Sequence, residues 1–476
     1  MSVARAVILT AVVASGLGAH VGSPDVFFQG KAGPYPLLVA IRPPDVIPGV
    51  ARIEVRALSG DVSEIQLTPT PMTGIAATHP PVADIAQRSQ TDPRFFEGAL
   101  WLMSTGSWEV RIRVSGEQGS GELPVPVPAV ALRTRPMNRG VSYFLIGMMV
   151  FLTVGLVAIV GAGVREAQLS PGKESGARWS RPAVIAMGCV SIVLIFALWQ
   201  GAAWWGEDAA TYTRNIYKPL QISLLLNSGH VEMRLTDPGW LPLRKLDDLL
   251  PDHGHLMHLF LVRWPAMDRV YHLHPDETAP GYFTTLLPSL EGGTYRIYGD
   301  VVHASGFAET AVGETTLPEV HGKALSDDDA AGPSLPAGGF QMVWLSDQTK
   351  PISATELNLF AFEIVGPDGK PVNDLQPYMG MGGHAEFIKQ DGSVFAHVHP
   401  TGSVPMASVA VASPVAMMAM HETKPGPIVS FPYGVPTPGK YRIFVQMKRA
   451  GKVETGSFEF TASPAIATTG AATGGK

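Results

Sequence analysis

The sequence carries one histidine motif twice. The first copy is His253-Gly-His-Leu-Met-His258 followed by Tyr271-His-Leu-His-Pro275, and the second is Met379-Gly-Met-Gly-Gly-His384 followed by Ala396-His-Val-His-Pro400. Eight of the 14 histidines lie in these stretches, and two methionines of the second copy stand where the first copy has histidines. Imidazole and thioether groups are the side chains that copper sites recruit.

The second copy predicts a β-hairpin whose register can be counted from its turn. Asp391-Gly392 between two strand-like runs is typical of a two-residue type I′ turn. Counting outward places His384 opposite His399 and Glu386 opposite His397. Opposed residues on one face have Cβ atoms roughly 4.5–5.5 Å apart, so we expect the three histidines of this copy to converge.

The first copy reaches the same pairing through a different loop. The segment Trp264–Asp268 forms a longer turn that places His258 opposite His274, and His272 shares their face because it lies two residues before His274. The residues upstream of each hairpin can complete its ligand set, with His253 and His255 in the first copy and Met379 and Met381 in the second. The candidate metal ligands are His253, His255, His258, His272, His274, Met379, Met381, His384, His397 and His399.

Ligands of these types suit copper, with zinc as the alternative. The thioethers of the second copy favour copper, in particular Cu(I), because zinc gains little from them. The alternative interpretation is structural, with ring nitrogens bonded to loop carbonyls and a proline ending each strand. His303 can approach the first set from a neighbouring strand. The segment Met417–His421 is interpreted as a flexible apolar loop, with copper collection as the alternative.

The regions around the two motifs are predicted to be duplicated β-sandwich domains. Gly293-Thr-Tyr-Arg-Ile-Tyr298 matches Gly439-Lys-Tyr-Arg-Ile-Phe444 as a closing strand after a glycine turn. The domains are expected at residues 212–318 and 340–462. The glycine- and proline-rich segment 319–339 is predicted to be a linker, and residues 463–476 a disordered tail.

The N-terminal half combines a β domain with apolar segments. Residues 1–19 are typical of a secretory signal peptide, and residues 20–138 alternate in period two, as expected for another β-sandwich. Residues 141–164 and 182–205 are uncharged runs long enough to cross a bilayer, joined by a basic loop at 165–181. The predicted fold is therefore mainly β, with three immunoglobulin-like sandwiches, a two-helix transmembrane hairpin and a signal peptide.

Charge and motif content exclude several classes of function. A net charge of -6 provides no basic field for nucleic acid. No phosphate loop, nucleotide fingerprint or Ser/His/Asp order is present, so neither a nucleotide ligand nor an enzyme is expected. The single cysteine, Cys189, allows no disulfide within the chain. The exported domains must depend on their own cores for stability.

The hairpins that end in His-Leu-His-Pro275 and His-Val-His-Pro400, with their Gly-x-Tyr-Arg-Ile strands, resemble the YtkA-like and FixH-like exported β-sandwich domains. The resemblance covers the two repeats, about half of the chain. It implies copper binding and a bacterial cell-envelope role. Met379 and Met381 depart from an all-histidine pattern, so the metal preference of the second copy is carried over least securely.

The expected protein is anchored in the bacterial inner membrane by two spans, with both large domains periplasmic. There it would bind copper for storage, buffering or delivery to an envelope protein partner. One alternative is a structural or assembly protein whose sandwiches make protein–protein contacts and whose histidines are structural. Another is a copper enzyme that uses His20 as the mature N-terminus, which requires cleavage after Ala19.

Overall fold

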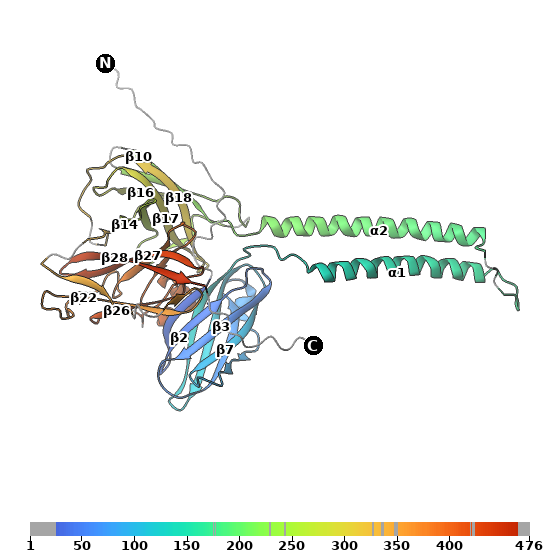
Figure 1. The fold of residues 1–476 in the computed structure, drawn as a ribbon, viewed down its shortest axis with the longest axis horizontal. Coiled ribbons are helices and arrows are strands. Elements are labelled where there is room, and N and C mark those ends of the chain that lie inside the picture. Colours follow the sequence, from blue (N-terminus) through green and yellow to red (C-terminus); the bar gives the residue numbers. More distant parts are fainter. Residues whose placement is uncertain are drawn as a thin grey trace, which may run out of the picture. The chain divides into compact units, whose positions relative to one another are not determined.

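The computed structural model describes residues 25–464 except 175, 177, 228–229, 242–243, 326–327, 335–337, 347–350, 419 and 421–423. The chain is mainly β, with several sheets and two long apolar helices (Figure 1). The predicted signal peptide, His20, His421 and the tail beyond residue 464 lie outside the described residues. The chain divides into two compact units, residues 131–216 and the β-rich remainder.

The N-terminal β domain consists of two antiparallel sheets. One has the order β1 (Val26–Ala32), β2 (Tyr35–Arg42), β3 (Gly49–Ala57), β7 (Phe95–Leu102), β6 (Gln87–Arg88). The other has the order β5 (Asp84–Ile85), β4 (Val62–Pro71), β8 (Gly106–Gly116), β9 (Gly119–Ala129). Burial alternates along β3, as expected for a strand with one face on a core.

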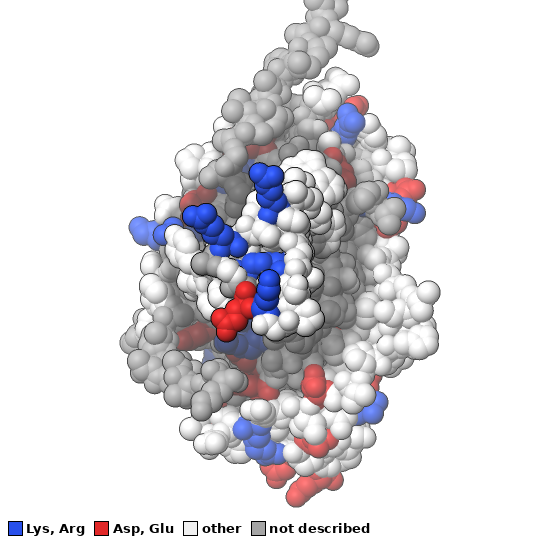
Figure 2. All heavy atoms as spheres, turned by 90° about the vertical axis from the view of Figure 1, so that its right-hand side faces the viewer, with Lys and Arg blue, Asp and Glu red and all other residues white. Residues whose placement is uncertain are grey.

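The two long helices are α1 (Arg139–Glu166) and α2 (Arg181–Arg214), both long and apolar enough to cross a membrane. Asn138 and Ser180 accept hydrogen bonds from backbone N–H groups of the first turns, which fixes where the helices begin. The helix α2 continues through a polar end beyond the predicted limit at residue 205. Basic side chains gather at the loop end of this hairpin (Figure 2).

The first repeat forms a single large sheet. Its strands run in the order β15 (Asp276–Ala279), β16 (Tyr282–Leu286), β11 (His230–Thr236), β10 (Gln221–Asn227), β18 (Ala308–Leu317), β17 (Gly293–His303), β13 (His258–Arg263), β14 (Val270–Leu273), β19 (Ala330–Gly332), with β12 (Leu249–Leu250) beside β17. One parallel pair, Gln221 with Val312, joins β10 to β18. This single junction connects two otherwise antiparallel halves.

The second repeat has two sheets. The smaller has the order β20 (Gln341–Trp344), β22 (Asn358–Val365), β26 (Ile428–Tyr433). The larger has the order β21 (Ile352–Ser353), β28 (Lys452–Ser463), β27 (Gly439–Arg449), β24 (His384–Lys389), β25 (Phe395–Val398), with β23 (Leu375–Gln376) beside β27. Two short helices, α3 (Met406–Ala412) and α4 (Pro414–Met418), follow β25. The order β18-β17-β13-β14 matches β28-β27-β24-β25, as duplication predicts.

The predicted register of both histidine hairpins is confirmed. Phe260 pairs with His272 on β13 and β14, and Glu386 pairs with His397 on β24 and β25. The predicted type I′ turn is wrong, because of its two central residues only Gly392 has a positive φ, 72°. The Gly392 N–H donates to the Lys389 carbonyl, which closes the turn one residue early without shifting the strands.

A strand lies within the segment 319–339 that composition predicted to be a linker. The residues of β19 pair with Val270–His272 on β14, and Ala330 is buried. Farther along, the Ser334 N–H donates to the Thr455 carbonyl of β28 at 3.0 Å. This segment extends one sheet and leads into the next repeat, so it is part of the folded structure.

The two repeats pack against each other through their histidine hairpins. A separate apolar cluster joins Phe260, Val262, Tyr298 of the first repeat to Phe395 and Phe444 of the second, and the Tyr298 and Phe395 rings stack at 4.1 Å. Odd-numbered residues of β13, such as Leu259 and Leu261, instead fill the core of their own repeat. The hairpins are therefore buried on both faces.

The N-terminal domain is joined to the second repeat at Gly402, and this junction can be tested. Gly402 has φ of 118° and bridges Phe28, and an added Cβ would collide with the Phe27 carbonyl oxygen. We expect Gly402→Ala to lower the free energy of unfolding by more than about 1 kcal/mol in denaturant unfolding. Gly451→Ala is the control, because Gly451 has φ of 73° but open space around it. Equal losses would show that only backbone strain matters.

Candidate metal centre

Eight histidines from both repeats form one continuous cluster at the interface between the hairpins. Two groups within it have ring nitrogens that all lie within 4.8 Å of one another: His258, His272 and His274, and His253, His384 and His399. The groups adjoin, since the ring centroids of His258 and His397 are 5.4 Å apart. The first group is the one predicted from the sequence.

In the first group, hydrogen-bond partners determine which ring nitrogens carry protons. The His258 Nε2 lies 3.1 Å from the Asp252 carbonyl oxygen, which can only accept, so Nε2 carries the proton. The His272 Nδ1 lies 2.9 Å from Gln446 Oε1 and is likewise protonated. In neutral rings, His258 Nδ1 and His272 Nε2 are then both unprotonated, yet they are 3.0 Å apart. With this orientation of the Gln446 amide two lone pairs face each other, and either a cation at this position or a flip of the amide, whose Nε2 has no hydrogen-bond partner among the described residues, removes the conflict.

The second repeat repeats this arrangement. The His384 Nε2 donates to the Tyr378 carbonyl at 3.3 Å, and His384 Nδ1 lies 2.9 Å from His397 Nε2. The His397 Nδ1 lies 3.4 Å from a carboxyl oxygen of Asp300 on the first repeat. With Asp300 ionised, the same two lone pairs face each other. Burial raises the pKa of Asp300 to about 7, so this copy, unlike the first, has a titrating partner.

Burial makes added protons poor candidates for a cation in this cluster. It lowers the pKa of five histidines well below the ordinary value of 6.5, with further lowering from neighbouring histidines: His258, His272, His384, His397 and His399. Neutral imidazoles are what a metal ion binds. Ligand nitrogens about 2.0–2.1 Å from a tetrahedral ion lie roughly 3.3–3.4 Å apart, so both pairs would open slightly to share an ion.

His253 belongs to the second group, although its sequence position suggested the first. Its ring centroid lies 5.2 Å from that of His384 and 5.1 Å from that of His399. It occupies a turn with φ of 51°, and Met379 has φ of 50° at the equivalent place. The neighbouring His255 stays with the first group, where it stacks on His274 at 4.0 Å. The first repeat thus contributes one histidine to the group of the second.

Aspartates of the supposed linker hold the first group in place. The carboxylate of Asp329 accepts from the backbone N–H of His274 at 3.0 Å and from its Nδ1 at 3.1 Å. This fixes the tautomer that leaves His274 Nε2 unprotonated, and that buried nitrogen has no hydrogen-bond partner among the described residues. Asp328 lies 3.5 Å from His255 Nε2. A carboxylate behind a histidine is a common arrangement at metal sites.

Met379 and Met381 lie in the wall of a cavity of about 440 Å³ next to His253. The cavity is also lined by Met406, Met417 and Met420 of the segment after β25. Direct ligation by Met379 and Met381 stays a prediction.

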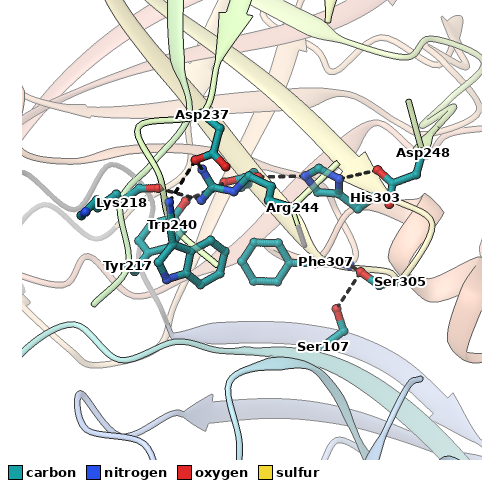
Figure 3. Close-up of polar contacts among 11 residues, drawn as sticks. Ser107, Tyr217, Lys218, Asp237, Trp240, Arg244, Asp248, His303, Ser305 and Phe307 are labelled. Atoms are coloured by element: carbon teal, nitrogen blue, oxygen red, sulfur yellow. Dashed lines mark hydrogen bonds and ion pairs between the residues drawn. The ribbon is translucent and has the colours of Figure 1, made fainter. Parts of the chain in front are cut away.

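His303 is held away from the cluster. Its Nδ1 lies 2.7 Å from Asp248 and its Nε2 lies 2.8 Å from Glu309, which also pairs with Arg244 (Figure 3). Although burial opposes it, these two carboxylates raise the pKa of His303 above 6.5. A charged histidine between two acids serves structure, so His303 is not a ligand candidate.

Sequence reasoning missed three polar residues that organise the centre. Gln446 and Asp300 face histidines of the opposite repeat, and they occupy equivalent positions because His384 pairs with Gln446 and His258 with Asp300. Tyr378 donates to the Asp328 carbonyl at 2.8 Å and its oxygen lies 3.4 Å from His272 Nδ1. Aligning the two closing strands would have marked the Asp300/Gln446 position, but not its partner.

Residues 338–464 match the model of a domain of unknown function, DUF8832. None of the curated proteins matches the chain. Among solved structures, a tetra-tandem repeat in the extending region of a large adhesion protein shows 10% identity and a TM-score of 0.17, over 88% of this chain and 71% of that one. An ICAM-5 D1–D4 ectodomain fragment shows 8% identity and a TM-score of 0.15, over 90% of this chain and 77% of that one. Similarities this distant do not indicate a function.

Proposed function

We propose that this chain is a membrane-anchored protein of the cell envelope that binds copper at the centre between its repeats. Two ions per chain are expected, one in each histidine group, for storage, buffering or delivery to an envelope partner. The observation that carries the proposal is the convergence of ring nitrogens, which lie within 4.8 Å of one another in each group and 3.0 Å and 2.9 Å apart in the pairs His258–His272 and His384–His397. One cation in each group would be bound by these nitrogens.

The membrane part of the proposal is supported by two apolar helices and by the charges around them. Arg165 in the last turn of α1 and Lys173 and Arg178 in the loop favour a cytoplasmic position for this end by the positive-inside rule. Arg133, Arg135 and Arg139 at the other end argue the opposite way, so the proposed signal peptide decides the orientation. Both flanking β regions would then be periplasmic, consistent with export by the proposed signal peptide. We also propose that the chain has three immunoglobulin-like sandwiches and that its repeats are similar to YtkA-like and FixH-like domains.

Copper is preferred to zinc because the second group lies beside soft ligands. Zinc accepts imidazole as readily as copper does, so the histidines alone do not discriminate. The methionine-lined cavity adjoins His253 of the second group. Thioethers select Cu(I), and we expect the second group to discriminate more strongly against zinc than the first.

The test is a metal titration of the full chain in detergent after chelator treatment. Anaerobic titration with Cu(I) against a competing chelator should give two tightly bound ions. His274→Asn and His399→Asn should each remove one ion, and the double variant both. His321→Asn is the control, because His321 is exposed and outside the cluster. Binding by the double variant equal to that of the unmodified protein would show that the proposed centre is not the copper site.

Removing the carboxylate behind His274 should weaken only one ion. We expect Asp329→Ala to lower the copper affinity of the first group roughly 10- to 100-fold, because His274 loses the partner that orients its ring. Chelator competition measures both affinities. The exposed Asp276→Ala is the matched control, since it removes a carboxylate two residues from His274. A similar loss in both variants would indicate a general charge effect.

A structural role is the second candidate, and one observation favours it. His272 bonds to Gln446 and His397 approaches Asp300, so the histidines also connect the repeats. In that case, histidine substitutions would destabilise the protein equally with and without metal. The envelope protein would then use its β domains for protein–protein contacts.

A further inference from the structure

We propose that the methionine-lined cavity beside His253 is a separate binding site through which reduced copper, as Cu⁺, enters the second histidine group. The inference rests on the proposed function, because it assigns the centre its source of metal. Of 18 methionines in the chain, five line this one cavity: Met379, Met381, Met406, Met417 and Met420. His253 lines it too, and also belongs to the second group.

The chemistry of the wall determines which ion can use it. Among the described residues that line the cavity, none has a carboxylate, amide or hydroxyl side chain; the others are Pro251, Gly254, Gly380, Ala407 and Ala410. Such a wall cannot replace the water ligands of a hard divalent cation. It can exchange thioethers for the ligands of a soft monovalent one, since thioether sulfur selects Cu(I). Ag⁺ should use it in the same way.

The cavity exists because the second repeat has a segment that the first lacks. In the first repeat, residues 275–281 suffice to connect the His-x-His-Pro motif to β16. In the second, residues 400–427 connect the same motif to β26 and include α3 and α4. Met406, Met417 and Met420 all come from this insertion. Two differences between the repeats, the insertion and the methionines Met379 and Met381 in place of histidines, therefore supply side chains to the same cavity wall.

A buried carboxylate fixes the insertion to the turn that presents His253. The Asp252 carboxylate accepts from the Ala407 N–H of α3 at 2.7 Å, across the boundary between repeats. Asp252 is almost completely buried. The methionine wall and His253 are thus held by adjacent residues, so an ion bound at the thioethers has His253 in the same wall.

The experiment compares the full-length protein with Met417→Leu/Met420→Leu, which keeps the apolar volume but removes two sulfurs. Transfer of Cu⁺ from a chelator should slow at least about tenfold, equivalent to about 1.4 kcal/mol of barrier, while the stoichiometry stays at two. Uptake of Cu²⁺ and Zn²⁺ should not change. The control is Met103→Leu/Met137→Leu, at two exposed methionines that do not line the cavity. Equal Cu⁺ rates in both double variants would overturn the inference.

A second readout does not depend on the histidines. With ¹³C-methyl-labelled methionine, Ag⁺ should shift the resonances of the cavity methionines before others, also in the His274→Asn/His399→Asn background. If Ag⁺ shifts the methionine resonances but the histidine groups of the unmodified protein bind no copper, the cavity site stands and the proposed function is contradicted. Filled histidine groups without any methionine shift would overturn the cavity site alone.

Discussion

Copper added to the metal-free protein at one hundred times its Kd should raise the free energy of unfolding by about 5 kcal/mol, from about 2.7 kcal/mol for each of two sites. The gain is expected because each ion binds ring nitrogens that converge in the folded protein and not in the unfolded chain. Denaturant unfolding of the full chain in detergent, followed by circular dichroism of the β domains, measures it.

The His274→Asn/His399→Asn variant is the matched comparison for this prediction. Its metal-free stability should stay close to that of the unmodified protein, since neither residue supplies the His272–Gln446 contact between the repeats. Copper should then add almost nothing. If the unmodified protein gains no stability from copper or zinc, the histidines are structural and the proposed function fails.

The hairpin register could be predicted because it depends only on local counting. Alternation along β24 and β25, together with a glycine near the turn, brought Glu386 opposite His397, and an error in the turn type did not matter. Register is robust in this way because a slip by one residue would turn every side chain to the wrong face. The same argument placed His258, His272 and His274 together.

The exchange of His253 between the groups could not be predicted from the sequence. It depends on two hairpins packing face to face, and no local pattern shows which of two buried faces meets the other repeat. Continuous burial along β13 and β24 was a signal that could have been used, since a hairpin with apolar residues on both faces must have a partner on each.

Composition alone also did not identify residues of the candidate centre and of the cavity wall in two segments. The run around Asp328 and Asp329 is polar and flanked by glycine and proline, as in a linker, but Asp329 pairs with His274. Met417 and Met420 follow Pro414 and were interpreted as a flexible apolar loop, yet both line the cavity beside His253. In both segments the deciding partner lies far away in the sequence.

Glu386 provides the last prediction, because it is a buried acid at a place where the first repeat has Phe260. Both residues pair with the central histidine of their hairpin. The Glu386 side chain is fully buried, and neither carboxyl oxygen has a hydrogen-bond partner among the described residues. Burial raises its pKa well above 4.5, and the nearby Asp300 raises it further. The folded protein therefore keeps a proton that the unfolded chain loses.

Between pH 4.5 and the raised pKa of Glu386, the folded state binds more protons than the unfolded state, so the free energy of unfolding falls as pH rises. The loss is up to about 1.4 kcal/mol per pH unit from this one group. Glu386→Gln removes this pH-dependent loss. We therefore expect the stability of the variant relative to the unmodified protein to increase steadily from pH 5 to pH 8. The samples are treated with chelator so that bound metal does not affect the comparison. Glu319→Gln is the control, because Glu319 is exposed to solvent and should leave the pH dependence unchanged. Parallel stability curves for Glu386→Gln and the unmodified protein would mean that Glu386 is ionised in the folded state, and that a positive charge in the neighbouring histidine cluster compensates it.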